Sequence, residues 1–397
     1  MKKFTRFFAT VAAVSMVAAS LTGCGSKSDN TASTDTTADS ATAGDTLKIG
    51  GIGPITGGAA VYGLAVKNAA ELAVKEINEA GGINGMQVEF KFEDDEHDAE
   101  KSVNAYNSLK DWGMQMLMGT VTSTPCTAVV EETHSDNMFQ LTPSGSAVES
   151  IAGDNAFRVC FSDPNQGIGA ADYIAENFAD SKVAVIYNSS DVYSSGIYEK
   201  FAAEADTKGV DIVDTEAFTK DAKTDFSVQL QKIKESGADL VFLPIYYEEA
   251  ALILTQADQA GLDVTFFGCD GLDGVIGQLG DNAELAEGVM LLTPFAADAK
   301  DEKTQTFTAA YQEAYDGATP NQFAADAYDA IYIIKAAIEQ AEATPDMSVS
   351  DLCEALKVAM TEITVEGVTG TMTWDASGEP TKEPKAMVIK DGAYSAV

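Results

Sequence analysis

Two polar turns hold the residue types best suited to binding a carboxylate. Residues 121–125 read Val-Thr-Ser-Thr-Pro and residues 142–146 read Thr-Pro-Ser-Gly-Ser, and each turn follows a short apolar run. Thr124 before Pro125 has the pattern of a helix N-cap, and Ser144 is expected to begin a second helix. Hydroxyls and free N–H groups at two helix N-termini can hold a carboxylate without a positively charged side chain. Two well-capped helices without a ligand are the alternative.

Asp270 and three tyrosines supply complementary chemistry. Asp270 lies in the run Gly-Cys-Asp-Gly directly after a predicted strand, so its carboxylate can pair with an ammonium group. Tyr62, Tyr193 and Tyr246 also follow predicted strands, and their rings can line an apolar slot. The alternative roles are a solvated turn aspartate and ordinary packing tyrosines.

The sequence gives little support for catalysis, a metal or a cofactor, and we expect none of them. It has no Gly-x-Ser-x-Gly nucleophile motif and no Walker sequence, so any ATPase must be a separate chain. The only histidines are His97 and His134, and the acidic run 93–98 around His97 lacks the spacing of an EF-hand. Four scattered cysteines have no metal-ligand spacing, so we expect free, mostly buried thiols. They are Cys126, Cys160, Cys269 and Cys353.

The charge balance excludes one class of partner. The 397 residues include 25 lysines and arginines against 62 aspartates and glutamates, which gives a net charge of −37. Nucleic-acid binding needs a basic surface, so this composition argues against it. It argues equally against direct adhesion to anionic lipid. An acidic body fits a soluble, exported protein but does not identify a ligand.

The N-terminus predicts export and a lipid anchor. Lys2, Lys3 and Arg6 precede an uncharged apolar run that ends in Leu-Thr-Gly-Cys, with the cysteine at position 24. This ending resembles the lipobox of bacterial lipoproteins, in which the cysteine receives a lipid and the signal is cut before it. We therefore predict a signal peptide at 1–23 and a lipidated, flexible tether at 24–46 that begins with Cys24. The alternative is an ordinary signal peptide with a chance cysteine.

Beyond the tether, short apolar runs alternate with amphipathic segments. Examples are a strand at 47–53 before a helix at 60–80, and a strand at 182–187 before a helix at 193–207. Such alternation predicts parallel sheets with crossover helices, and the length predicts two doubly wound α/β lobes. In such sheets ligands bind beyond the carboxyl ends of the strands.

Several short motifs, in order, resemble one family. They are the run from Ile49 to Gly57 (IGGIGPITG), Gly-Gly-Ile-Asn-Gly at 81–85, Glu-Asp-Asp at 93–95, the two serine turns, Gly-Cys-Asp-Gly around Asp270, and Ala-Tyr-Asp-Ala at 327–330. Together they resemble the leucine/isoleucine/valine-binding proteins, type I periplasmic binding proteins that serve ABC importers. The resemblance covers about residues 47–390. It implies one lobe from 47–164 plus 294–373 and another from 165–293 plus 374–397, joined by a hinge.

The resemblance also implies a role for eight residues. The serines that hold the α-carboxylate are Ser123, Ser144 and Ser146. From the other lobe come Tyr193, Tyr246 and Asp270, and Asp270 takes the α-ammonium. The rings that flank the side-chain pocket are those of Tyr62 and Phe323. Asp270 replaces a glutamate, Phe323 a common tyrosine and Ser144 a common alanine. These departures leave an α-amino acid as the ligand and the choice of its side chain open.

The expected function is therefore binding, not catalysis. We expect a lipid-anchored protein outside the cytoplasm, on an extracellular or periplasmic membrane face. It would capture a neutral aliphatic, branched-chain type L-amino acid and deliver it to the permease subunits of an ABC importer with a separate ATPase. Two alternatives remain: another small ligand, such as a different amino acid, an amide, urea or an aromatic acid, or a sensor with the same fold.

Overall fold

A computed structural model describes residues 46–397. The predicted signal peptide, Cys24 and the tether up to residue 45 lie outside the described residues. Thr46, the last residue assigned to the tether, is the first residue of strand β1 (Thr46–Gly53), where it pairs with Gln87. None of the helices in the described part of the chain is both long and apolar enough to cross a membrane.

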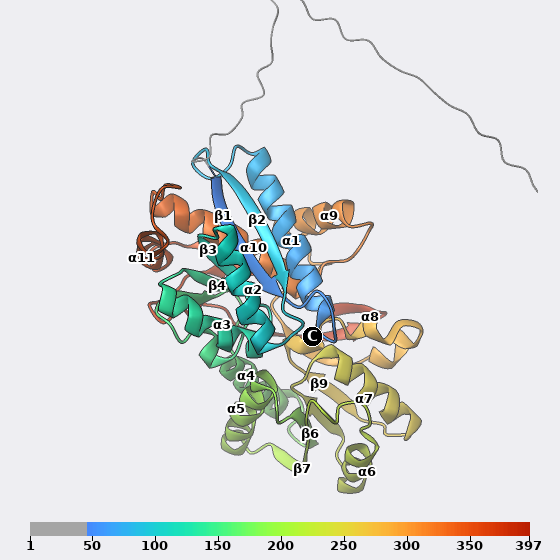
Figure 1. Ribbon diagram of the computed structural model, residues 1–397. Coiled ribbons are helices and arrows are strands. Elements are labelled where there is room, and N and C mark those ends of the chain that lie inside the picture. Colours follow the sequence, from blue (N-terminus) through green and yellow to red (C-terminus); the bar gives the residue numbers. More distant parts are fainter. Residues whose placement is uncertain (1–45) are drawn as a thin grey trace, which may run out of the picture. The chain divides into compact units, whose positions relative to one another are not determined.

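The first sheet has five parallel strands with helices on both faces. The strands are β1, β2 (Gln87–Asp94), β3 (Met116–Gly119), β4 (Gln140–Thr142) and β5 (Ala156–Arg158). Their helices are α1 (Ala60–Glu79), α2 (Ala99–Trp112), α3 (Ser123–Asp136), α10 (Gln322–Gln340), α11 (Val349–Met360) and the short η1 (Val148–Ile151). The strand order is β2-β1-β3-β4-β5. Leu47 and Ile49 of β1 join the core with α1 and α10, whereas Ile52 packs with α2 and α3. Figure 1 shows these four helices around the strands β1 to β4.

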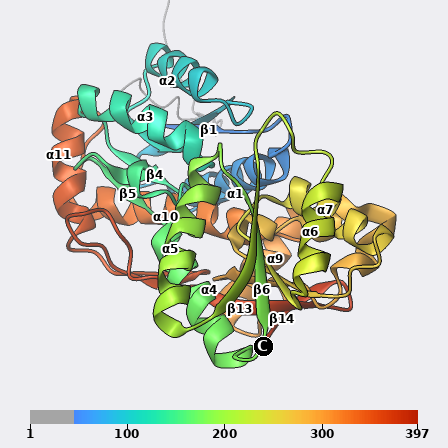
Figure 2. The ribbon, with the colours of Figure 1, turned by 90° about the horizontal axis from the view of Figure 1, so that it is seen from below.

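The second sheet has seven strands, five of them parallel. They are β6 (Lys182–Asn188), β7 (Asp211–Phe218), β8 (Leu240–Leu243), β9 (Thr265–Gly268), β10 (Met290–Thr293), β13 (Lys385–Lys390) and β14 (Ala393–Ala396), in the order β14-β13-β10-β9-β8-β6-β7. Their helices are α4 (Asp163–Asn177), α5 (Val192–Lys208), α6 (Ser227–Ser236), α7 (Tyr247–Gln259) and α8 (Val275–Leu279). Val183 and Val185 pack with α4 and α5, whereas Ala184 and Ile186 belong to the core that includes α6 and α7. Figure 2 shows α4 and α5 on one side of β6 and α6 and α7 on the other. The antiparallel pair β13 and β14 extends one edge.

Three segments connect the two sheets. Residues 159–162 lead from β5 to α4, residues 294–301 lead from β10 to α9 (Glu302–Ala314), and residues 373–384 lead from β12 (Gly370–Met372) to β13. The doubly wound α/β architecture is confirmed by this topology. The exact lobe boundaries stay a prediction. The four cysteines of the described chain are buried and free, as expected.

Candidate ligand-binding site

All eight residues predicted for the site line one small cavity. It lies between loops that follow strands of the two sheets and has a volume of only about 10 Å³. Its lining comprises Tyr62, Val121, Thr122, Ser123, Ser144, Ser146, Tyr193, Tyr246, Asp270 and Phe323. A space of this size holds about one water molecule, so an amino acid fits only if the two sets of loops move apart. Whether these residues bind a ligand stays a prediction.

The serine turns meet at one wall of the cavity, and their hydroxyls differ in what they can still bind. The Ser144 hydroxyl donates its single proton to the carbonyl oxygen of Val121 at 2.6 Å. The Ser123 hydroxyl accepts the N–H of Ala147 at 3.2 Å and keeps its own proton. The buried Ser146 hydroxyl lies beside the buried carboxyl of Asp163, where it opposes the rise that burial causes in the pKa of Asp163. No other group within residues 46–397 bonds to this hydroxyl. Ser123 therefore offers a free hydroxyl donor to a ligand, Ser146 can donate either to a ligand or to Asp163, and the Ser144 hydroxyl already donates to Val121.

The first serine turn opens a helix as predicted, although the helix begins earlier than expected, whereas the helix predicted at the second turn was wrong. Helix α3 begins at Ser123, so Thr124 lies inside its first turn and is not the N-cap. Ser144 begins no helix, because the short η1 starts four residues later. The Thr142 hydroxyl accepts the N–H of Gly145 at 2.7 Å, which closes a local turn in place of a helix. Of the two serine turns, only the first therefore presents a helix N-terminus to the cavity, and the second contributes its own hydroxyl and backbone groups.

Asp270 lies in the short helix η2 (Asp270–Leu272) and is held on three sides. Its Oδ1 accepts the hydroxyl proton of Tyr193 at 2.7 Å. Its N–H donates to Gln166 of α4 at 3.1 Å, and its carbonyl accepts from Gln322 of α10 at 2.9 Å. Burial raises the pKa of Asp270 to about 7, although the Tyr193 hydrogen bond opposes that rise. A ligand ammonium beside this carboxyl would favour its charged form.

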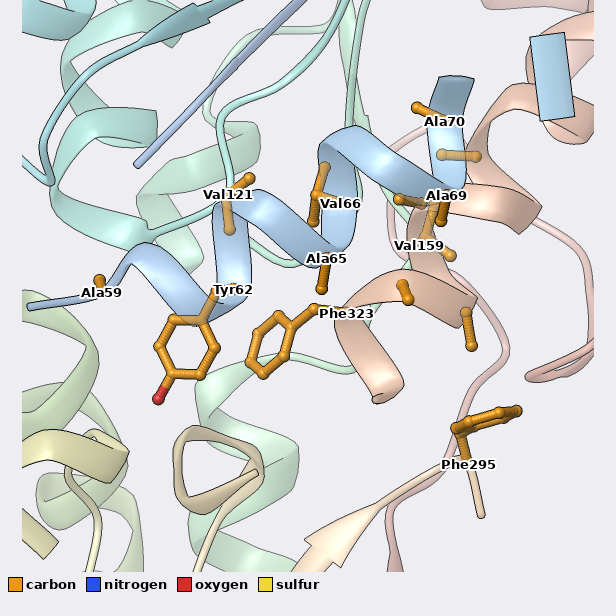
Figure 3. Close-up of a cluster of buried hydrophobic side chains, with 14 of the residues drawn as sticks. Ala59, Tyr62, Ala65, Val66, Ala69, Ala70, Val121, Val159, Phe295 and Phe323 are labelled. Carbon is orange, nitrogen blue, oxygen red and sulfur yellow. The ribbon is translucent and has the colours of Figure 1, made fainter. Parts of the chain in front are cut away.

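Aromatic rings form the apolar wall. The rings of Tyr62 and Phe323 lie 4.1 Å apart between centroids, from α1 and α10 respectively (Figure 3). The rings of Tyr193 and Tyr246 stack at 4.7 Å with an interplanar angle of 11°. The Tyr246 hydroxyl is buried and finds no hydrogen-bond partner in the described chain. The wall therefore combines ring surface for an aliphatic group with one free hydroxyl.

Hydrogen bonds also join elements of the two sheets across the cavity. The Tyr62 hydroxyl donates to the carbonyl of Gly271 and accepts the N–H of Tyr247 at 3.1 Å. At the start of α3, the Thr124 hydroxyl donates to Oδ1 of Asp191, the N-cap of α5, at 3.1 Å. These bonds exist only while the two sets of loops are in contact, so they stabilise the closed arrangement.

Sequence reasoning missed four residues of the site. Val121 and Thr122 line the cavity as neighbours of Ser123, so the turn that was predicted already contained them. Gln166 and Gln322 hold the backbone of Asp270 from helices distant in the sequence. No local pattern marks either glutamine for this role, although Gln322 directly precedes the predicted Phe323.

The wider surface hollow beside α9 and α10 is a weaker candidate. Its lining includes Lys303, Glu366, Lys335 and Glu339. Lys303 pairs with Glu366 at 3.3 Å, and Lys335 pairs with Glu339 at 2.6 Å. These charges already satisfy one another. The buried carboxyl in the lining, Asp329, already accepts from the N–H groups of Val368 and Thr369 and from the Thr369 hydroxyl.

Comparison with known proteins gives the same assignment. The family model described as "Periplasmic binding protein" matches residues 46–392. The chain is 32% identical over 341 residues to "Leu/Ile/Val-binding protein homolog 3" of Brucella melitensis, covering 84% of this chain and 88% of the relative. It is 31% identical over 341 residues to a leucine-, isoleucine-, valine-, threonine- and alanine-binding protein of Pseudomonas aeruginosa, covering 84% and 87%.

Solved structures agree on the fold. The branched-chain amino acid transporter substrate-binding protein LivJ of Streptococcus pneumoniae, in complex with isoleucine, superposes with a TM-score of 0.80 at 29% identity, covering 88% of this chain and 98% of that one. LivJ is a substrate-binding protein of a transporter, and the two curated relatives are named for the amino acids that they bind. Periplasmic binding proteins work outside the cytoplasm. The chain therefore belongs to the leucine/isoleucine/valine-binding protein family and has the type I periplasmic binding protein fold.

Proposed function

We propose that this protein captures a neutral, branched-chain type L-amino acid in the central cavity and delivers it to an ABC importer. Ser123 and Ser146 donate hydroxyl protons to the α-carboxylate, and Ser144 shapes the turn. Asp270 accepts from the α-ammonium, with Tyr193 and Tyr246 beside it. Tyr62 and Phe323 cover the aliphatic side chain. The names of the curated relatives and the isoleucine in the LivJ complex support this class of ligand.

The observation that carries the proposal is the buried carboxyl of Asp270 in the same cavity as the serine donors. Asp270 is 4% exposed and Ser146 is 1% exposed. A buried carboxylate is costly unless an opposite charge or hydrogen bonds compensate it. A zwitterion supplies an ammonium to Asp270 and a carboxylate to the serines in one small molecule. An uncharged amide or urea matches only half of this arrangement.

Ligand binding would close the two lobes, because the ligand contacts loops on both sides of the cavity. A ligand that touches both sets of loops favours the closed form through its differential affinity for that form. The three connecting segments provide the hinge. At the membrane, Cys24 and the tether would keep the protein near permease subunits, with the ATPase on a separate chain. The protein itself carries out no chemical reaction in this scheme.

Calorimetry and thermal-shift measurements against the twenty amino acids test the proposal. Leucine, isoleucine or valine should bind and raise the melting temperature. Asp270→Ala should weaken binding by about tenfold or more because the ammonium loses its buried partner. Asp270→Asn keeps the shape and removes the charge, and exposed Asp263→Asn serves as the control. Unchanged affinity in Asp270→Asn would remove Asp270 from the site.

One competing ligand and one competing role complete the design. Benzoate tests an aromatic acid, because a solute-binding protein of Rhodopseudomonas palustris with this fold, at 21% identity and a TM-score of 0.79, was solved with benzoate. Benzoate lacks an ammonium and would leave Asp270 without a charge partner. A shift with benzoate and with no amino acid would reject the proposal. Amino-acid uptake that depends on this protein would separate an importer from a sensor.

A further inference from the structure

We propose that Arg158 is a positioning residue for the carboxylate-binding turn and links that turn to the segment 373–384 between the sheets. This inference rests on the proposed function, because it assumes that the serine turn holds a ligand carboxylate. Arg158 is the last residue of β5 and is 0% exposed. It does not line the cavity. Its action therefore passes through the groups that it holds.

The guanidinium holds the turn by its carbonyl groups. Nη1 of Arg158 donates to the carbonyl oxygens of Gly145 at 3.2 Å and Ser146 at 2.5 Å. In a planar trans peptide, the C=O and the N–H that follows it point in opposite directions. Fixing the Gly145 carbonyl toward Arg158 therefore turns the N–H of Ser146 away from Arg158. Ser146 lines the cavity, so this N–H becomes a fixed donor on the side where the carboxylate would bind.

The charge on Arg158 strengthens that donor. A guanidinium stays protonated in proteins, and hydrogen bonds from a charged donor are about twice as strong as neutral ones. A carbonyl that accepts such a bond polarises its peptide group, which makes the attached N–H a better donor. Arg158 thus brings a positive charge behind the turn of a protein whose net charge is −37. The ligand carboxylate gains from that charge without touching it.

Arg158 is also hydrogen-bonded to the third connecting segment, residues 373–384. Its carbonyl accepts the indole N–H of Trp374 at 2.8 Å, and its own N–H donates to the carbonyl of Gly378 at 3.1 Å. Nη2 lies 3.2 Å from Oε1 of Glu379. The turn and the segment that must bend during closure are therefore joined to the same residue, the turn through its guanidinium and the segment mainly through its backbone. Movement of residues 374–379 would displace the N–H of Ser146.

A purely structural role predicts a different result from a positioning role. If Arg158 only filled and stabilised the core, its loss would weaken every ligand equally. If it orients a donor for the carboxylate, its loss would weaken ligands with a carboxylate and spare those without one. Leucine and leucinamide make this comparison, because the amide keeps the ammonium and the side chain but lacks the negative charge.

The test measures the dissociation constants of leucine and leucinamide for the mature protein and two variants. Arg158→Met keeps the volume and should weaken leucine binding about tenfold or more, with leucinamide within about twofold. Arg158→Lys keeps a charge but loses the planar fork, so it should fall between the wild type and Arg158→Met. Glu379→Gln leaves both carbonyl bonds in place and should keep the wild-type ratio of the two constants.

Circular dichroism and melting curves show which variants fold. If Arg158→Met does not fold, the ratio in Arg158→Lys decides the question. A folded Arg158 variant with the wild-type ratio of leucine to leucinamide affinity would overturn the inference. Failure of the wild-type protein to bind any amino acid would instead overturn the proposed function, so the two failures are distinct.

Discussion

The hydroxyl of Tyr193 bridges the side chain of Asp270 and the peptide that follows it. It donates to Oδ1 of Asp270 at 2.7 Å and accepts the N–H of Gly271 at 2.9 Å. Tyr193 is 2% exposed, so water cannot easily replace it. The orientation of the Asp270 carboxyl therefore depends on a residue from a different element, α5.

Tyr193→Phe should weaken amino-acid binding by about tenfold, because a hydrogen bond to a charged group contributes roughly 1.5–3 kcal/mol. It should also raise the pKa of Asp270 further, because the Tyr193 hydrogen bond holds that pKa down. Isothermal calorimetry with leucine measures the first effect. Tyr198→Phe, on the same helix but outside the cavity, is the matched control. Equal affinity of Tyr193→Phe and wild type would mean that the ligand ammonium binds elsewhere.

Binding should weaken as the pH falls below neutrality. Burial raises the pKa of Asp270 to about 7 in the ligand-free protein, and an ammonium ligand pairs with the ionised form. Each pH unit below 7 should therefore reduce the affinity by up to about tenfold, whereas affinity should level off above 7. Titrations between pH 5 and 8 test this slope. Asp270→Asn should bind weakly at every pH, and a slope that persists in this variant would assign the proton to another group.

The stability of the ligand-free protein should fall as the pH rises, in the opposite direction to the ligand affinity. The folded pKa of Asp270 lies above its ordinary value of 3.8, so folding favours the protonated form between about pH 4 and 7. This contribution is present at low pH and is lost as the pH rises through 7. Buried Asp191 and Asp273, whose pKa values burial raises to about 6, act in the same direction. His97 opposes them, because burial lowers its pKa to about 4. Melting temperatures without ligand should therefore be higher at pH 5 than at pH 8.

Tyr62→Phe should shorten the lifetime of the closed complex. The variant keeps the ring against Phe323 but leaves the Gly271 carbonyl and the Tyr247 N–H without their partner. We expect about tenfold faster ligand dissociation, with an unchanged preference among leucine, isoleucine and valine. Stopped-flow dissociation measures the rate. Tyr315→Phe removes a similar hydroxyl bond, to the Asn68 carbonyl, that does not cross the cavity, so it should leave the rate unchanged.

Lys382→Met should destabilise the fold strongly. Lys382, in the segment 373–384, pairs with Asp326 of α10 at 2.7 Å, and both side chains are 3% exposed. Breaking a buried pair on one side costs about 3–5 kcal/mol, because the remaining charge is left unpaired. Urea unfolding measures the loss. The exposed pair of Lys335 and Glu339 on the same helix gives the comparison, and Lys335→Met should cost less than about 1 kcal/mol. Similar losses in both variants would contradict the buried-pair account.

The sequence was sufficient for the order of elements and for most of the cavity lining. Alternation of apolar strands with helices is a local pattern, so α1 at 60–79 and β8 at 240–243 fell close to their predicted bounds. The start of α3 was misplaced by the common Thr-Pro pattern at Thr124. Ser144 was assigned to a helix because a run of hydroxyl residues around a local turn, which Thr142 closes here, has the same sequence signal as an N-cap.

The residues that support the site could not be found in this way. Arg158, Gln166 and Gln322 act on backbone groups 12 to 104 positions away in the chain. Such contacts depend on how the two sheets are brought together, which no local spacing encodes. Arg158 in particular follows an ordinary strand pattern, and only its burial and its hydrogen bonds distinguish it.

The hydrogen bond between Trp374 and Arg158 gives the protein an intrinsic fluorescent probe of hinge closure. The chain has two tryptophans, and Trp112 lies at the end of α2, with Lys48 5.0 Å from its ring centroid. Trp374 is 4% exposed and donates to the backbone of the residue that holds the serine turn. In a Trp112→Phe background, the single remaining indole would report hinge closure through its fluorescence, without any attached dye.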